Sequence, residues 1–323
     1  MRLFTLLCLC SVTAFAETEL PWFDNSRLSL DLTSRSSYWQ KESQFVQQEF
    51  LGLDYYQVLS IDNTELGQLT LQPFLYRIDN GYRTAAIYDD DHDWEFVVRT
   101  ATLNYNAWGL DKPYIKVGHF EIPFGVEFSK DTFGDLHQYG QGMKMGMKMD
   151  WGIALGQELN EYKYEISATR GSGMKYRDEG DPFAYAGRIS TLNDSQWALG
   201  TSLFYGEIID KDTTSERSAI AIDFEYFYNT HGVIFEIYTG QQNEKDIWGS
   251  LVEFNSQSQD ESKEVYLQHF YKKMGSQTAY SALVAGISYR LSKELTISNQ
   301  IKKELESINT QETLFELQLR YRF

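Results

Sequence analysis

The chain has 323 residues, 15% of them aromatic, and a formal net charge of −17 from 29 Lys and Arg against 46 Asp and Glu. Its mean hydropathy of −0.44 excludes a bundle of membrane-spanning helices, each of which needs about 18 or more apolar residues in a row. The aromatic content argues against intrinsic disorder, and the acidic balance argues against a nucleic-acid binder. A large soluble domain remains, or a membrane protein whose apolar residues alternate with polar ones.

The first sixteen residues are predicted to form a secretory signal peptide. Arg2 provides a positive start, residues 3–12 are mostly apolar, and Ala-Phe-Ala at 14–16 is a small-x-small cleavage site. Both cysteines of the chain lie before this site, so the mature protein would have neither disulfides nor cysteine-bound metal. We therefore expect export and a single folded domain over 17–323.

After the signal peptide, apolar and polar residues alternate with a period of two, which is typical of β-strands. Ile220, Ile222 and Phe224, for example, alternate with Ala221, Asp223 and Glu225. The pattern predicts about sixteen strands, and fourteen is the alternative because 246–256 and 263–272 alternate less clearly. The predicted strands are 27–39, 45–59, 66–77, 94–108, 113–120, 143–159, 162–171, 183–191, 195–207, 217–229, 231–241, 246–256, 263–272, 278–290, 293–305 and 311–323.

Long connections are expected at 78–93, 121–142, 172–182 and 208–216, with tight turns between them. Short turns at one end and long loops at the other are typical of an outer-membrane barrel. The face opposite the apolar one carries small and charged residues, which suits a polar lumen better than the outside of a soluble sandwich. The predicted fold class is therefore all-β, a transmembrane antiparallel β-barrel in a Gram-negative outer membrane, surrounded by lipid and lipopolysaccharide.

Two parts of the chain resemble known barrel sequences. Residues 118–127 (GHFEIPFGVE) resemble the G-x-F-x-x-P-F-G-x-E stretch of the phosphate-selective porin O/P family, and the resemblance extends over about 113–173. It implies a sixteen-stranded homotrimeric porin. The ending at Phe323 resembles the C-terminal signal of bacterial outer-membrane barrels, which implies recognition by the barrel-assembly machinery.

Phosphate selectivity does not follow from the resemblance, because no ladder of cationic residues can be aligned and the net charge of −17 repels anions on approach. We expect a passive channel for small hydrophilic solutes with weak or cation-leaning selectivity. The alternatives are a phosphate- or polyphosphate-selective porin and a barrel that serves as a scaffold for a surface partner. Candidate lumen charges of both signs are Arg27, Asp31, Arg35, Lys163, Glu165, Arg188, Asp223, Glu225, Glu236, Lys302, Glu304, Glu316, Arg320 and Arg322.

The connection 121–142 is predicted to fold into the barrel and narrow it, because long ordered loops are usually functional. An ordinary surface loop is the alternative. Its candidate constriction residues are Glu121, Glu127, Lys130, Asp131, Asp135 and His137. The sequence has neither a G-x-S-x-G nor an H-E-x-x-H motif, so we predict no enzymatic activity, no cofactor and no metal site.

Overall fold

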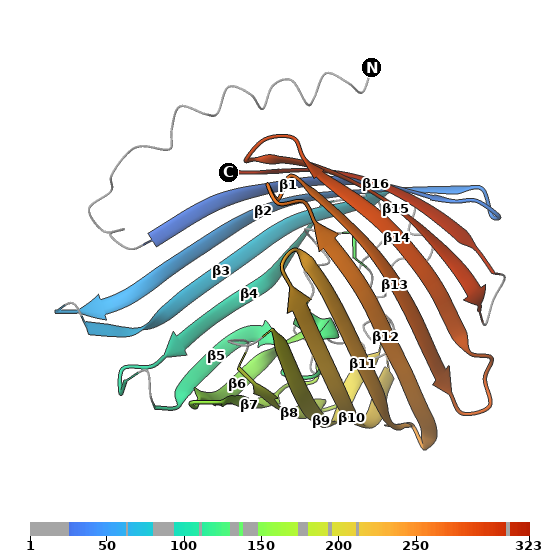
Figure 1. Ribbon diagram of the computed structural model, residues 1–323. Coiled ribbons are helices and arrows are strands. Elements are labelled where there is room, and N and C mark those ends of the chain that lie inside the picture. Colours follow the sequence, from blue (N-terminus) through green and yellow to red (C-terminus); the bar gives the residue numbers. More distant parts are fainter. Residues whose placement is uncertain are drawn as a thin grey trace.

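The computed structural model describes residues 26–62, 64–79, 94–109, 112–129, 136–137, 148–173, 180–192, 196–210, 213–307 and 311–323. They form sixteen strands and one 3-10 turn, η2 (Glu127–Ser129) (Figure 1). The strands are β1 (Ser26–Trp39), β2 (Gln44–Ile61), β3 (Thr64–Asp79), β4 (Glu95–Tyr105), β5 (Tyr114–Glu121), β6 (Met149–Glu158), β7 (Tyr162–Thr169), β8 (Phe183–Thr191), β9 (Trp197–Asp210), β10 (Thr213–Tyr228), β11 (His231–Gln242), β12 (Lys245–Gln257), β13 (Lys263–Met274), β14 (Tyr280–Arg290), β15 (Leu295–Glu306) and β16 (Thr313–Arg322). No helix in this part of the chain is long and apolar enough to cross a membrane.

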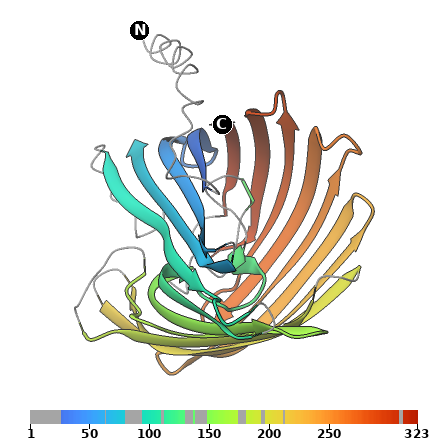
Figure 2. The ribbon, with the colours of Figure 1, turned by 90° about the vertical axis from the view of Figure 1, so that its left-hand side faces the viewer.

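The strands close into one antiparallel barrel in which each strand pairs with its neighbours in the sequence. β1 and β16 complete the ring, with Asp31 opposite Arg322 and Trp39 opposite Leu314. Figures 1 and 2 show the tilted strands following one another in chain order around the barrel. The predicted antiparallel β-barrel is confirmed, and within the described residues it has sixteen strands rather than fourteen.

Burial alternates along the strands as the period of two predicts. In β11, for example, Ile234, Glu236 and Tyr238 are buried, whereas Phe235 and Ile237 between them are exposed. In a closed barrel the buried set faces the interior, and the exposed set forms the outer surface. Every residue of a strand is thereby assigned to a face by its parity.

One predicted connection is wrong. Residues 208–216 were expected to form a long loop, but β9 continues to Asp210 and β10 begins at Thr213. Ile208 pairs with Ser215, and Ile208 is fully buried on the inner face. The polar residues around this hairpin have the composition of a loop. The end of a long strand can carry polar side chains while the backbone hydrogen bonds between the two strands continue. The signal peptide and residues 143–147 lie outside the described residues.

The inner face is more apolar than the expected polar lumen. One buried cluster includes Phe74, Tyr76 and Ile78 of β3, and another includes Tyr266 and Phe270 of β13. In β3 the residue between Phe74 and Tyr76 is Leu75, which is apolar and exposed on the outer face, so this part of the strand carries large apolar residues on both parities. Large apolar residues on both parities of a strand indicate a packed interior. Reasoning that assumes one apolar and one polar face for each strand overlooks this signal.

Candidate functional site

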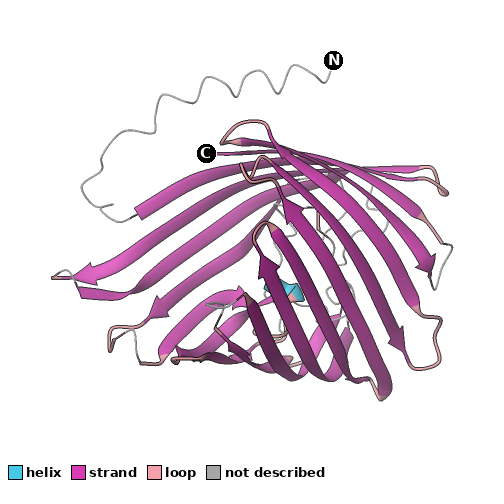
Figure 3. Cartoon of the chain, in the orientation of Figure 1, coloured by secondary structure: helices cyan, strands magenta, loops and turns pink. Residues whose placement is uncertain are grey.

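The segment that follows β5 enters the barrel. Ile122, Phe124 and Phe128 are each at most 1% exposed, although the segment belongs to no strand. Figure 3 shows η2 in cyan, and in Figure 2 the green chain around it lies within the ring of strands. We call residues 122–128 the inner segment.

The inner segment packs on a bed of small side chains. Phe124 and Phe128 share a buried cluster with Ala184 and Ala186 of β8 and with Ala219 and Ala221 of β10. The Phe124 ring also meets Phe204 of β9 edge-on, with 6.1 Å between the ring centroids. Alanine on these strands leaves the space beside the barrel wall that two phenylalanine rings occupy.

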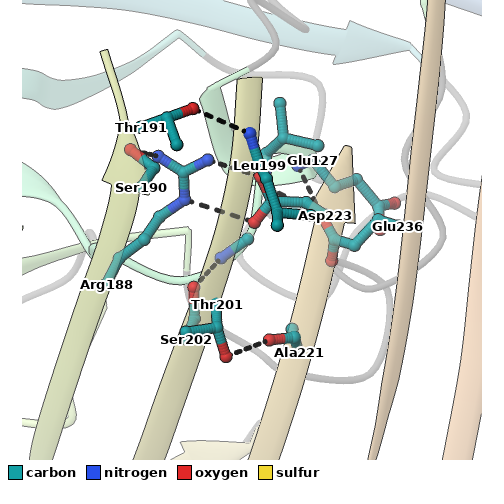
Figure 4. A network of polar contacts seen from close by, with 12 residues as sticks. Glu127, Arg188, Ser190, Thr191, Leu199, Thr201, Ser202, Ala221, Asp223 and Glu236 are labelled. Atoms are coloured by element: carbon teal, nitrogen blue, oxygen red, sulfur yellow. Dashed lines mark hydrogen bonds and ion pairs between the residues drawn. The ribbon is translucent and has the colours of Figure 1, made fainter. Parts of the chain in front are cut away.

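Polar contacts fix the backbone of the inner segment to the same wall (Figure 4). The amides of Val126 and Glu127 donate to one carboxylate oxygen of Glu236 on β11, at 2.7 and 2.8 Å. The Gly125 amide donates to the hydroxyl of Ser202 on β9 at 2.9 Å. Because Glu236 is fully buried and one of its carboxyl oxygens accepts both amide hydrogen bonds, this side chain anchors the segment in place.

Gly125 is required at the anchor for two reasons. Its φ of +66° lies in the left-handed region, which side-chain-bearing residues avoid. A Cβ atom there would also lie 2.5 Å from a carboxylate oxygen of Glu236. The glycine therefore lets the backbone approach the buried carboxylate closely enough for the two amide contacts.

A partly buried ion pair lies beside the anchor. Arg188 of β8 contacts Asp223 of β10 at 2.5 Å and donates to the Ser190 hydroxyl at 3.2 Å. The pair reaches across β9 at Gly200, where a Cβ atom would lie 2.5 Å from Asp223. The wall under the inner segment is thus held by charges of opposite sign as well as by apolar packing.

A second described part of the same connection reaches the neighbouring wall. The ring of His137 stacks on Tyr266 of β13, with 3.8 Å between the ring centroids. Its Nε2 lies 3.9 Å from the carboxylate of Glu253 on β12, which also accepts a 2.7 Å hydrogen bond from Gln268. Together the two parts contact the inner wall from β8 to β13.

The candidate constriction residues have different positions. Glu127 and His137 are buried between the connection and the wall. Glu121 ends β5 on the parity opposite to the inward-facing Phe120. The other three candidates, Lys130, Asp131 and Asp135, lie outside the described residues.

All fourteen candidate lumen charges lie on the inner-face parity of their strands. The structure pairs several of them: Arg320 Nε donates to Asp31 at 3.0 Å, and Arg322 contacts Asp54 at 2.7 Å. Lys116, which the sequence reasoning missed, contacts Glu165 at 2.6 Å. Arg217, Lys272 and Glu253 were missed as well, although their parity, shared with Ala219, Phe270 and Leu251, places them on this face.

No protein-family model matches the sequence, and comparison with curated proteins gives no match. Solved structures do resemble it. Pseudomonas putida OprB has a TM-score of 0.70 at 8% identity, over 93% of this chain and 94% of that one. Salmonella typhi OmpF, in complex with daunomycin, has a TM-score of 0.69 at 10% identity, over 92% and 97%. An anion-selective porin from Comamonas acidovorans has 0.64 at 11%, over 92% and 99%. The chain therefore has the fold of the outer-membrane porins.

Proposed function

We propose that this protein is an outer-membrane porin, a passive diffusion channel for small hydrophilic solutes that is narrowed by the connection after β5. The observation that carries the proposal is the inner segment, anchored inside a closed barrel by Glu236, Ser202 and the alanine bed. An infolded segment leaves less room for solute on one side of the lumen, so it sets the pore size together with the charges of the remaining wall. Export through a cleaved signal peptide and assembly through the C-terminal strand belong to the same proposal.

The expected selectivity is weak or cation-leaning. The inner wall carries both signs, since Arg320, Arg188 and Lys116 each face a carboxylate, and the chain as a whole has a net charge of −17. Paired charges contribute little net field, whereas the overall acidic balance attracts cations to the mouths. In planar bilayers with a salt gradient of KCl, we expect a reversal potential of the sign that indicates cation preference. A reversal potential of the opposite sign would contradict this selectivity.

Membership of the phosphate-selective porin O/P family is the finer form of the proposal, supported by the 118–127 motif. The inner segment is the second half of this motif, and its Gly125 and Glu127 take part in the anchor. Buried Arg217 and Lys272 add cations to the inner wall and favour phosphate selectivity as the second candidate function. Phosphate that blocks the chloride current at low concentration would support this candidate, and an unchanged current would dismiss it.

We also propose that the protein assembles as a homotrimer through the outer face of β1–β3. This face carries Glu49 and Arg77, whose charged groups lie 3.8 Å apart and are 40% and 38% exposed. Gln47 joins them and hydrogen-bonds to two serines of β1. On a face toward lipid, an arginine costs from about 2–4 kcal/mol at the bilayer midplane down to about 0–1 kcal/mol near the interfaces. Arg77 lies two residues before the end of β3, so this cost is small, and a polar partner surface that pairs both charges is the better environment. At such an interface each copy presents both a carboxylate, from Glu49, and a guanidinium group, from Arg77, to its neighbour.

Reversing one charge is expected to weaken this assembly. Arg77→Glu places two carboxylates side by side, so the oligomer should dissociate at a lower temperature on a semi-native gel. Adding Glu49→Arg restores opposite charges and should restore the wild-type dissociation temperature. Lys303→Glu, the same reversal on the exposed outer face of β15, serves as the control and should have no effect. Equal behaviour of Arg77→Glu and the control would place the interface elsewhere.

A further inference from the structure

The outer surface has a groove that the proposed function does not explain. It has a volume of about 1120 Å³ and crosses the strands from β5 to β11. Its sides are exposed apolar side chains, among them Ile166, Tyr185, Leu203 and Tyr205. The inward-pointing Phe204, on which the inner segment packs, also borders it, so a single layer of backbone separates the groove from that segment.

Small residues create the groove. Gly187 of β8 lies between Ile166 and Leu203 in the register of the sheet, and Ala168 of β7 lies opposite Tyr185. A Cβ atom on Gly187 would meet only Ile166 and a backbone oxygen, at 3.3 and 3.7 Å. The groove is therefore deepest at these small residues, which lie between large side chains. A larger side chain could be added there with little displacement of its neighbours.

The two ends of the groove differ in polarity. At the β5 and β6 end the lining is Ile115, Ile153 and Leu155. At the β10 and β11 end it includes the polar residues Ser218, Thr239 and Gln241, close to where β11 ends. An amphipathic molecule with a hydrocarbon chain and a polar head matches this order.

We propose that the groove binds the hydrocarbon chain of a membrane lipid, with the lipid's polar head at the Ser218 and Gln241 end. This rests on the proposed position of the barrel in a membrane. A second copy is the less suitable occupant, because the outer face proposed to meet another copy lies on β1–β3, and the groove begins beyond β4, at β5. The groove's rim offers no comparable charges of both signs among the residues that line it.

The test counts bound lipid by native mass spectrometry while palmitoyl-oleoyl-phosphatidylethanolamine is titrated into the detergent-solubilised protein. Gly187→Trp fills the groove, and the dissociation constant of the lipid obtained from the titration should rise roughly tenfold, which corresponds to about 1.4 kcal/mol. Ala168→Phe fills it from the neighbouring strand and should act alike, which guards against a folding defect of one variant. Ala285→Trp, on the exposed outer face of β14, is the matched control and should bind lipid as the wild type does.

Equal lipid binding by all four proteins would overturn the proposal. So would loss of the oligomer in Gly187→Trp with lipid binding unchanged, since the groove would then be a contact between copies. The conductance of the same preparations separates this result from the proposed function. If the wild type conducts and the filled variants still bind lipid, the channel proposal stands and the lipid site is wrong. If the wild type does not conduct, the channel proposal itself is contradicted.

Discussion

Replacing Phe124 with alanine is expected to release the inner segment from the wall while the barrel stays folded. Phe124 is fully buried and packs on Phe204 and the alanine bed, and a buried Phe→Ala change costs about 3–5 kcal/mol. Most of this energy stabilises docking of the segment, because the strand ladder contains none of its residues. Hydrogen exchange of the Val126 and Glu127 amides should accelerate by a hundredfold or more, at roughly tenfold for each 1.4 kcal/mol.

The control for this prediction is a phenylalanine on the outer face. Phe235→Ala removes an equally large side chain from β11, but Phe235 is exposed and points away from the segment. Exchange of the same two amides should then stay at the wild-type rate. If Phe124→Ala leaves these amides as protected as Phe235→Ala does, the apolar bed is not what holds the segment.

Replacing Glu236 is expected to have the second-largest effect. Glu236→Leu leaves the buried amides of Val126 and Glu127 without their acceptor, at a cost of about 1–3 kcal/mol for each. Part of this is offset, because Glu127 and Asp223 place like charges near Glu236. Glu236→Gln keeps an acceptor oxygen without the charge, so it should lose less. In single-channel records, the frequency of conductance steps should increase from the wild type to Glu236→Gln, and again from Glu236→Gln to Glu236→Leu.

Glu225→Gln is the charge-matched control for this series. Glu225 lies on the inner face of β10, the strand next to β11, and the change removes the same unit of charge. Its records should show steps as rarely as the wild type. Steps that are equally frequent in Glu225→Gln would assign the effect to the field of the lumen instead of the two amide contacts.

The strands could be read from the sequence because each residue's parity already specifies its face. This is why the fourteen candidate charges all lie on the inner-face parity. Arg217 and Lys272 could have been identified in the same way, because they lie two residues from Ala219 and Phe270 and therefore share their faces.

The anchor could not be predicted in this way. Glu236 lies 110 residues after Val126, and Ser202 lies 77 residues after Gly125. Only the closed ring brings these strands to the segment, and no local pattern encodes which inner-face residue the segment meets. The alanines of β8 and β10 were visible as small residues on the polar face, but the sequence suggested an open lumen there instead of a bed for two phenylalanine rings.

The most direct test of the central claim compares single-channel conductance of the wild type with that of Phe124→Ala combined with Phe128→Ala, in planar bilayers at one KCl concentration. A water-filled barrel narrowed by the inner segment predicts that both proteins conduct and that the double variant has the larger unit conductance. No conductance from either protein, or the same unit conductance from a double variant with a folded barrel, would contradict it.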